Sequence, residues 1–308
     1  MVCGGPVAEV LTGVGDNRFG VPGKYAVVGC AVCGLEQINP RPSPTELKRL
    51  YEAYYNFGGE RGTSYTRLRE VFFASWIYQV WLALDGDGSF HLPKGSGRLL
   101  DIGCNEGRGL KIYCRNGFSA EGLELNTKAA SVARNEGFSV HEAMLGDYYP
   151  TEGYDVAVLS NVLEHSLDPE QMLRDVARIL NPGGQVWISC PNSSSWLRRL
   201  FGRAWVNWHV PFHIVHFSPA TLRGVLLKTG FTAIELRQIT PALWVASSLI
   251  TRVFARNDRP TRQLRNPMLV LALTGLARIM LFPALYAGNL LGKGDCILAV
   301  ARKSVAMS

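Results

Sequence analysis

The stretch Leu99-Leu100-Asp101-Ile102-Gly103-Cys104-Asn105-Glu106-Gly107-Arg108-Gly109 decides the fold of this 308-residue chain. It begins as a short apolar run that ends in an acid, which predicts a buried strand. Three glycines within seven residues then require a tight turn and let a ligand approach the backbone closely. Helical sequence follows from Leu110 and ends at Asn116-Gly117. This order of strand, glycine turn and helix predicts the first half of a nucleotide-binding βαβ unit.

The spacing of the glycines separates two classes of cofactor. A dinucleotide fingerprint G-x-G-x-x-G would need glycines at 103, 105 and 108, but the chain has Asn105 and Arg108 at two of these positions. The pattern that is present, Asp101-x-Gly103-x-x-x-Gly107 after an apolar strand, resembles the glycine-rich loop of class I S-adenosylmethionine-dependent methyltransferases. A nicotinamide-dependent oxidoreductase is therefore the less favoured alternative.

A second set of motifs, about sixty residues further on, strengthens this resemblance. The run 154–160 is apolar on both sides, as a central parallel strand should be, and it leads into Asn161-Val162-Leu163-Glu164-His165. Asp168-Pro169 then begins a helix, which ends at Asn181-Pro182-Gly183-Gly184 before the next strand. The motifs and their spacing resemble the same family over residues 98–192.

The resemblance implies a fold and a cofactor. The fold is a doubly wound, seven-stranded, mostly parallel α/β sheet, and the cofactor is S-adenosylmethionine. Glu124 ends the second strand, where a carboxylate can accept both ribose hydroxyls. The loop at 144–147, after a third short strand, would flank the adenine. The residues that the resemblance assigns to the cofactor are Asp101, Gly103, Cys104, Asn105, Gly107, Glu124, Leu125 and Asn161.

The rest of the chain predicts additions to this core. Ser43-Pro44-Thr45-Glu46 has the residues of a helix start, and a second helix is expected over 64–84. The last strand, 295–301, is expected to lie antiparallel beside the sixth. We divide the chain into a cysteine module (1–42), a helical cap (43–97), the cofactor-binding core (98–240), a helical insertion (241–294) and the last strand with a tail (295–308).

Cysteine spacing near the N-terminus indicates a metal site. Cys30-x-x-Cys33-Gly34 is a turn that places two thiolates on one metal, and Cys3 supplies a third thiol. Similar methyltransferases carry two C-x-x-C-G knuckles before an N-P-R-P segment such as 39–42, and the fourth thiol would lie one residue before Met1. Either the start clips the module or the site has decayed. We expect a structural zinc on Cys3, Cys30 and Cys33, with ordinary reduced cysteines as the alternative.

Histidines supply the candidate catalytic groups. His165 follows the fourth strand, and His213-x-x-His216-Phe217-Ser218 resembles a segment after the fifth strand of sugar- and quinone-modifying relatives. No third metal ligand is evident beside this pair, so we expect a substrate pocket with His213 in polar surroundings. Because an imidazole titrates near neutrality, His165 or His213 is the expected general base. His216 and Glu164 would shape the pocket.

The charge distribution bears on the acceptor. The net charge is +7, and residues 196–265 alone carry eleven Lys and Arg against Glu235 and Asp258, a net +9. Such a field favours an anionic or carrier-linked acceptor, either a sugar, a glycan or a quinone-like ring, for O- or C-methylation. We expect Arg198, Arg199 and Arg203 to hold it in part. No nucleic-acid partner is expected, since the arginines alternate with apolar helical sequence.

Two apolar helical stretches, 241–254 and 268–291, precede the last strand. Arg278 and Pro283 are expected to break the second, and its longest uncharged run, Ile279–Gly292, has 14 residues. A bilayer span needs about 20, so a buried or lid-forming hairpin is favoured over peripheral membrane contact. Seven cysteines without a leader pattern predict a reducing cytoplasm. A non-catalytic binding protein with the same fold stays open.

Overall fold

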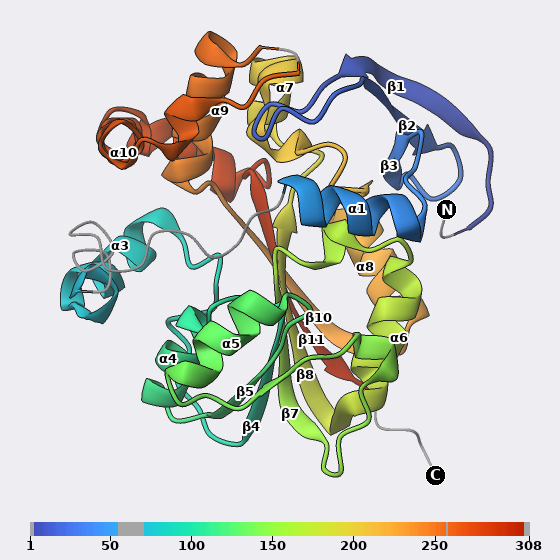
Figure 1. The fold of residues 1–308 in the computed structure, drawn as a ribbon, viewed down its shortest axis with the longest axis vertical. Helices are drawn as coiled ribbons and strands as arrows, with labels where there is room; N and C mark the ends of the chain where they lie inside the picture. Colours follow the sequence, from blue (N-terminus) through green and yellow to red (C-terminus); the bar gives the residue numbers. More distant parts are fainter. Residues whose placement is uncertain (1–2, 55–70, 257, 305–308) are drawn as a thin grey trace.

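A seven-stranded sheet forms the centre of the computed structural model, which describes residues 3–54, 71–256 and 258–304 (Figure 1). Its strand order is β10-β11-β8-β7-β4-β5-β6, and only the pairs that involve β11 are antiparallel. The predicted fold class is therefore confirmed. The strands of this sheet are β4 (Arg98–Ile102), β5 (Ser119–Leu123), β6 (Val140–His141), β7 (Tyr154–Ser160), β8 (Leu180–Pro191), β10 (Phe231–Ile239) and β11 (Cys296–Lys303).

Helices cover both faces of this sheet, as expected of a doubly wound fold. Helices α4 (Arg108–Arg115) and α5 (Thr127–Asn135) lie on one side, while α6 (Pro169–Ile179) and α8 (Pro219–Lys228) lie on the other (Figure 1). Apolar side chains of α6 and α8 share one buried cluster with β7 and β8. The sheet is thus buried on both faces, which explains the continuous apolar sequence of its central strands.

Local sequence signals fix the helix starts. The side chain of Asn126 accepts a hydrogen bond from Ala129 N, and that of Asp168 accepts one from Gln171 N, so both predicted caps are confirmed. The turn at 181–184 differs from its prediction because it is part of a longer strand. β8 begins at Leu180, which pairs with Tyr154 ahead of a bulge.

A second, four-stranded sheet carries the N-terminal residues. It contains β1 (Val7–Val14), β2 (Tyr25–Cys30), β3 (Glu36–Asn39) and, at its edge, β9 (Val215–His216). The N-terminal sheet therefore takes its fourth strand from the segment after β8. Its apolar side packs on three helices in the upper half of Figure 1. These are α7 (Trp196–Phe201), α9 (Ala242–Phe254) and α10 (Pro267–Leu290).

The helical cap is only partly as predicted. Helix α1 (Pro44–Tyr54) starts where expected, and Glu46 accepts hydrogen bonds from the backbone N–H and the hydroxyl of Ser43. The first part of the second predicted helix, 64–70, lies outside the described residues. Its later part is interrupted at Ser75, whose hydroxyl caps a new helix, α3 (Trp76–Asp85).

The prediction that Arg278 and Pro283 break the last helix is wrong. α10 runs without interruption through both residues. Arg278 is only 6% exposed because its guanidinium lies 3.5 Å from the buried carboxylate of Asp85, at the end of α3. The same carboxylate accepts the backbone N–H of Ala242 on α9. The charge is thus balanced inside the protein, and α10 does not have to end in order to hydrate it.

Close packing holds α10 against the protein. A Cβ atom on Gly288 would lie 2.7 Å from Nε1 of Trp196 on α7, whereas one on Gly275 would meet no atom within 4 Å. Only glycine at position 288 therefore allows this approach of the helix to the indole.

This contrast predicts opposite effects of one substitution. Gly275→Ala should stabilise the fold by up to about 1 kcal/mol, because alanine favours the helix. Gly288→Ala should leave the protein about 1–3 kcal/mol less stable than Gly275→Ala, because the methyl group overpacks the indole. Urea denaturation of the two variants measures the difference, and equal midpoints would contradict the packing described here.

Candidate functional site at the carboxyl edge of the sheet

Three neighbouring strands of the central sheet end at the same edge. In the order β7-β4-β5 they are followed by Asn161, by Gly103 and by Glu124. The first turn after β4 is fixed to β5, because Gly103 N donates to the carbonyl of Leu123 at 2.7 Å. The topology therefore brings residues from all three motifs of the sequence together, where open α/β sheets bind ligands.

Glu124 anchors the glycine loop. Its two carboxylate oxygens accept the backbone N–H groups of Asn105, at 2.9 Å, and of Asn126, at 2.8 Å. A carboxylate has about four lone-pair positions, so two remain for a ligand. The side chain that the sequence assigns to the ribose also holds the shape of the loop.

Asp101 is a buried acid at the end of β4. It is 7% exposed, and burial together with the nearby Glu124 carboxylate raises its pKa to about 7. No ion pair of Asp101 occurs within the described part of the chain. A Cβ on Gly109 would lie 2.8 Å from Oδ2 of Asp101, so a larger residue there would displace this carboxylate. Two acids close together at this edge suit a ligand that carries positive charge.

Two asparagines at this edge have unusual backbones. Asn105 has a φ of 53° and Asn161 a φ of 55°, both in the left-handed region. Gly107 has a φ of 78°, and a Cβ there would lie 2.8 Å from Cβ of Ala133 on α5. Such backbones concentrate at ligand-binding turns.

The remaining predicted cofactor residues differ in their surroundings. The thiol of Cys104 packs in a buried cluster with Leu110 and Ala130, so only its backbone is left for a ligand. Leu125 is exposed directly after Glu124. In the predicted adenine loop, Met144 is exposed and a short 3₁₀ turn, η1 (Leu145–Asp147), follows it.

Three histidines converge beside this edge. His165 ends a 3₁₀ turn, η2 (Leu163–His165), four residues after Asn161. His209 and His213 come from the segment between η4 (Val206–Trp208) and β9. One ring nitrogen of each histidine lies within 4.8 Å of the other two. Sequence reasoning missed His209, although it stands in the same aromatic stretch as His213.

The burial of these side chains corrects two predictions. His213 is 5% exposed and its ring packs against the rings of His165 and His209, so the expectation that it lies in an exposed polar loop is wrong. Its segment is buried because two tryptophans on it, Trp205 and Trp208, belong to the core. His216 is also buried, but it lies on β9 against the ring of Trp208 and outside the histidine cluster. Burial lowers the pKa of His165 to about 3 and those of His209 and His213 well below the usual value.

Polar and aromatic groups surround the cluster. The hydroxyl of Tyr51, on α1, lies 2.8 Å from Nδ1 of His165. The ring of Phe212 packs edge-on against Tyr51, and Phe19 packs against His209. Glu164 is 1% exposed, and burial raises its pKa to about 8. The cluster therefore lies in a dry, largely aromatic environment.

Two of the three arginines expected to hold the acceptor have structural roles. Arg198 lies 2.9 Å from Glu36 on β3 and stacks over the ring of Trp208. Its charge is balanced, so its assignment to an anionic acceptor is wrong. Arg203 donates to the carbonyl of Thr12 on β1. Arg199 is exposed on α7.

The three N-terminal cysteines meet at one place. Sγ of Cys3 lies 3.3 Å from Sγ of Cys30, and all three sulfurs, including that of Cys33, lie within 4.8 Å of one another. Within the described ranges, no fourth cysteine, histidine or carboxylate joins them. The arrangement is that of an incomplete tetrahedral thiolate site.

Comparison with known proteins gives one family and a set of partial relatives. A family model described as "Methyltransferase domain" matches residues 82–236. The chain is 30% identical over 149 residues to the ubiquinone biosynthesis O-methyltransferase of Klebsiella pneumoniae, which covers 43% of this chain and 60% of that protein. It is 30% identical over 147 residues to the protein of the same name from Escherichia coli O6:H1, covering 43% of this chain and 61% of that one. The chain thus spans about 60% of the length of these relatives.

A solved structure has a similar fold. The [4+2]-cyclase SpnF matches with a TM-score of 0.51 and 16% sequence identity, over 86% of this chain and 98% of that one. At this identity the likeness shows a shared fold alone.

Proposed function

The chain belongs to the methyltransferase domain family, and from this premise we propose that it transfers a methyl group from S-adenosylmethionine to a hydroxyl group of a quinone-like ring. One observation carries the proposal. Asp101, Glu124 and Asn161 lie at one edge of the sheet. A buried group of histidine and aromatic side chains begins directly after Asn161. The partial relatives named for O-methylation in ubiquinone biosynthesis support the class of acceptor.

The chain's own residues fit the cofactor. S-adenosylmethionine, when bound, supplies a methyl group on a positively charged sulfur. The two unused lone-pair positions of Glu124 suit two ribose hydroxyls. The buried carboxyl of Asp101 gains a compensating positive charge from the methionine part, which favours its ionised form. The glycine turn lets the backbone approach the ligand.

The proposed acceptor side surrounds the turn after β7. Phe19, Tyr51 and Phe212 offer apolar and edge contacts to a planar ring and exclude water. Transfer forms a bond between the acceptor oxygen and the methyl carbon, and breaks the bond from that carbon to sulfur. The hydroxyl proton must leave. His165 and His213 are neutral near pH 7, and they stay the proposed groups on the acceptor side together with Glu164.

The cysteine cluster supports a structural zinc as part of the same proposal. Thiolates are the preferred ligands of structural zinc, and three are in place in Cys3, Cys30 and Cys33. A metal there would tie the N-terminus to the turn after β2.

We further propose that the acceptor is reached at a membrane surface. α10 is, by length and composition, the one helix of the described residues that could cross a bilayer, but only 22% of its most apolar window is buried. Arg278 and Gly288 fasten one side of α10 to the protein, and Ile279 and Leu290 are 77% and 72% exposed. A helix held in this way suits the membrane interface better than a span.

Positive charge stands beside this apolar surface. The connection between α9 and α10 contains a cavity of about 540 Å³ that is lined in part by Arg256, Arg259 and Arg262. Arginine clusters next to an apolar helix attract anionic lipid headgroups. The helix α3, joined to α10 by the pair of Asp85 and Arg278, adds exposed Trp76.

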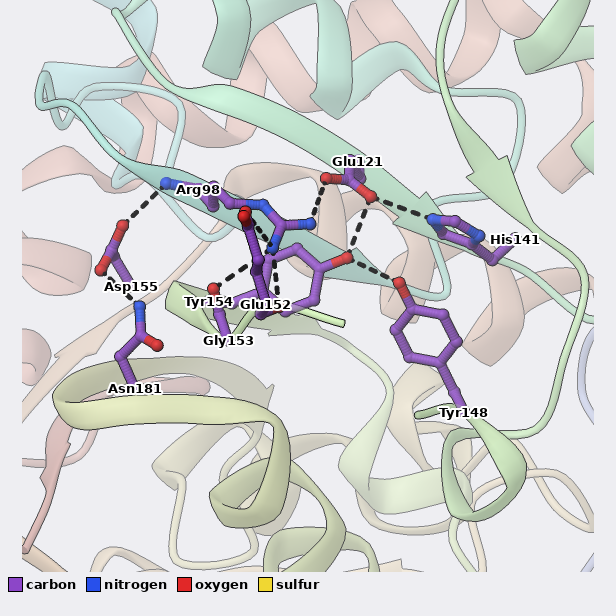
Figure 2. A network of polar contacts seen from close by, with 9 residues as sticks. All are labelled: Arg98, Glu121, His141, Tyr148, Glu152, Gly153, Tyr154, Asp155 and Asn181. Carbon is purple, nitrogen blue, oxygen red and sulfur yellow. Dashed lines mark hydrogen bonds and ion pairs between the residues drawn. The ribbon is translucent and has the colours of Figure 1, made fainter. Parts of the chain in front are cut away.

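The first test concerns the cofactor. Glu124→Ala should weaken S-adenosylmethionine binding by about 1–3 kcal/mol, roughly 5- to 150-fold, because ribose hydroxyls lose a charged acceptor. Glu121→Ala is a matched control, since it removes a carboxylate from the same strand. Glu121 binds Arg98, His141 and Tyr154 in a separate network (Figure 2). The folded Glu121 variant should therefore keep the wild-type affinity for S-adenosylmethionine.

Calorimetry on folded variants gives both values. Equal affinity in the two variants would remove Glu124 from the site. Product mass spectrometry with a prenylated catechol then tests transfer itself. A wild-type protein that binds NADH but no S-adenosylmethionine would overturn the proposed function.

The second test concerns zinc. The full chain should hold zinc that protects Cys30 and Cys33 from alkylation, because metal-bound thiolates are blocked, while Cys114 stays reactive as an internal control. Mass spectrometry of the alkylated peptides reports each thiol. Equal alkylation of Cys30 with and without a chelator would reduce the module to a loop with free thiols.

The third test concerns the membrane. The protein should float with vesicles of phosphatidylglycerol and phosphatidylcholine, and Ile279→Glu should lower the bound fraction several-fold, because it places a charge in the apolar surface. Leu227→Glu changes an exposed leucine of α8 and should leave binding unchanged. Absence of flotation would contradict the proposal, as would loss of self-association instead of lipid binding in the Ile279 variant.

A further inference from the structure

We propose that His165, His209 and His213 bind a divalent transition-metal ion in a second metal site, separate from the cysteine cluster. From the sequence, His165, His213 and His216 are expected around one acceptor, and no third metal ligand is evident beside His213 and His216. The structure supplies the third ligand from elsewhere in the chain and replaces His216 by His209.

The spacing of the ring nitrogens fits one shared ion. They lie within 4.8 Å of one another. Metal–nitrogen bonds of about 2.0–2.1 Å would bring them to roughly 3.4 Å from one another in a tetrahedral arrangement. Binding of the ion would therefore require a small rotation of the side chains. The rings of His165 and His213 and those of His209 and His213 stand nearly perpendicular, so they do not stack in parallel and can point toward a common centre.

Neighbouring groups orient two of the three rings. Nδ1 of His213 lies 2.8 Å from the carbonyl of Asn207, so that nitrogen carries the proton and Nε2 carries the lone pair. Nδ1 of His165 lies at the same distance from the hydroxyl of Tyr51. Metal-binding histidines are held in this way, with the second nitrogen bonded to a carbonyl or a polar side chain.

A buried carboxylate balances the charge of such an ion. Glu164 is nine-tenths or more buried, and neither of its carboxylate oxygens has a hydrogen-bond partner. Oε1 of this group lies 3.9 Å from Nε2 of His213. The charge of Arg18 acts on this carboxylate and also on the three histidines, and its guanidinium donates to the carbonyl of Val206. A buried carboxylate without a partner is costly, and a cation beside the histidines would remove that cost.

The ligand set indicates the class of metal. Imidazole nitrogens with a nearby carboxylate suit zinc, iron, cobalt or nickel and not magnesium or calcium. The consequence for methyl transfer rests on the proposed function. An acceptor hydroxyl bound to this ion would lose its proton to water more easily, because a metal lowers the pKa of a bound hydroxyl. The ion would then occupy the ring lone pairs of His165 and His213, so in this state the two histidines would hold the metal and would not act as the base. The resulting oxygen would then attack the methyl carbon as the carbon–sulfur bond breaks.

Cobalt loading distinguishes the two sites. In a variant with Cys3, Cys30 and Cys33 changed to serine, the full chain should still bind one equivalent of Co²⁺. Its spectrum should show d–d bands without thiolate charge-transfer absorption. Adding His209→Ala should weaken this binding by more than the 10- to 100-fold typical of losing a group that only supports a ligand. His141→Ala, which removes a histidine bound to Glu121, is the matched control and should not change it.

Each outcome decides the proposal. A folded cysteine variant without bound Co²⁺ overturns it, and so does equal Co²⁺ affinity in the His209 and His141 variants. Where His209→Ala does not fold, the cobalt spectrum of the wild-type chain decides, because nitrogen-only ligation has to appear beside the thiolate bands. None of these measurements involves S-adenosylmethionine or an acceptor, so failure of the metal site is separable from failure of the methyltransferase proposal.

Discussion

The carboxylate of Asp295 is the constraint on which the candidate site depends. It stands directly before β11, is fully buried, and accepts hydrogen bonds from the side chains of Ser195, Trp205 and Asn207. Its own backbone carbonyl accepts Asn192 N. One acid at the start of the last strand therefore gathers the segment that leaves β8. Burial raises the pKa of Asp295 to about 7 in spite of these three donors. Burial of this carboxylate therefore costs folding free energy, which the packing of the tryptophans must offset.

This constraint reaches the histidines through a short chain of contacts. Asn207 donates to Asp295 with its side chain, and its carbonyl lies beside Nδ1 of His213. On the other side, the backbone of Ile214 donates to the carbonyl of Glu164. The segment from β8 is thus fixed to the start of β11 at Asn207 and to the turn after β7 at Ile214. Rigid attachment of this kind is what a site needs if it is to hold reacting groups without further ordering.

Local signals made much of the fold predictable. Asn126 and Asp168 each cap a helix through a hydrogen bond to a residue three positions later, so both helix starts could be predicted from the local sequence. The glycine turn after Asp101 likewise indicates the edge of the sheet where ligands bind. Three of the failures involve partners far apart in the sequence. The sequence around Arg278 does not indicate that it pairs with Asp85, and the sequence around Arg198 does not indicate Glu36. In the same way, the sequence around His165 does not indicate that His209 lies beside it. A charged residue was therefore interpreted as exposed, and a buried histidine as part of a polar loop, because burial is decided by tertiary packing.

β9 has a consequence for how such proteins can diversify. Val215 and His216 form the edge strand of the N-terminal sheet, and they belong to the same segment as two of the clustered histidines. Glu36 pairs with His216 in register, and the same residue binds Arg198. Exchange of the first forty residues between homologues by recombination would leave this edge mismatched. We therefore expect the N-terminal sheet and the segment around β9 to be inherited together, as one unit that is discontinuous in the gene.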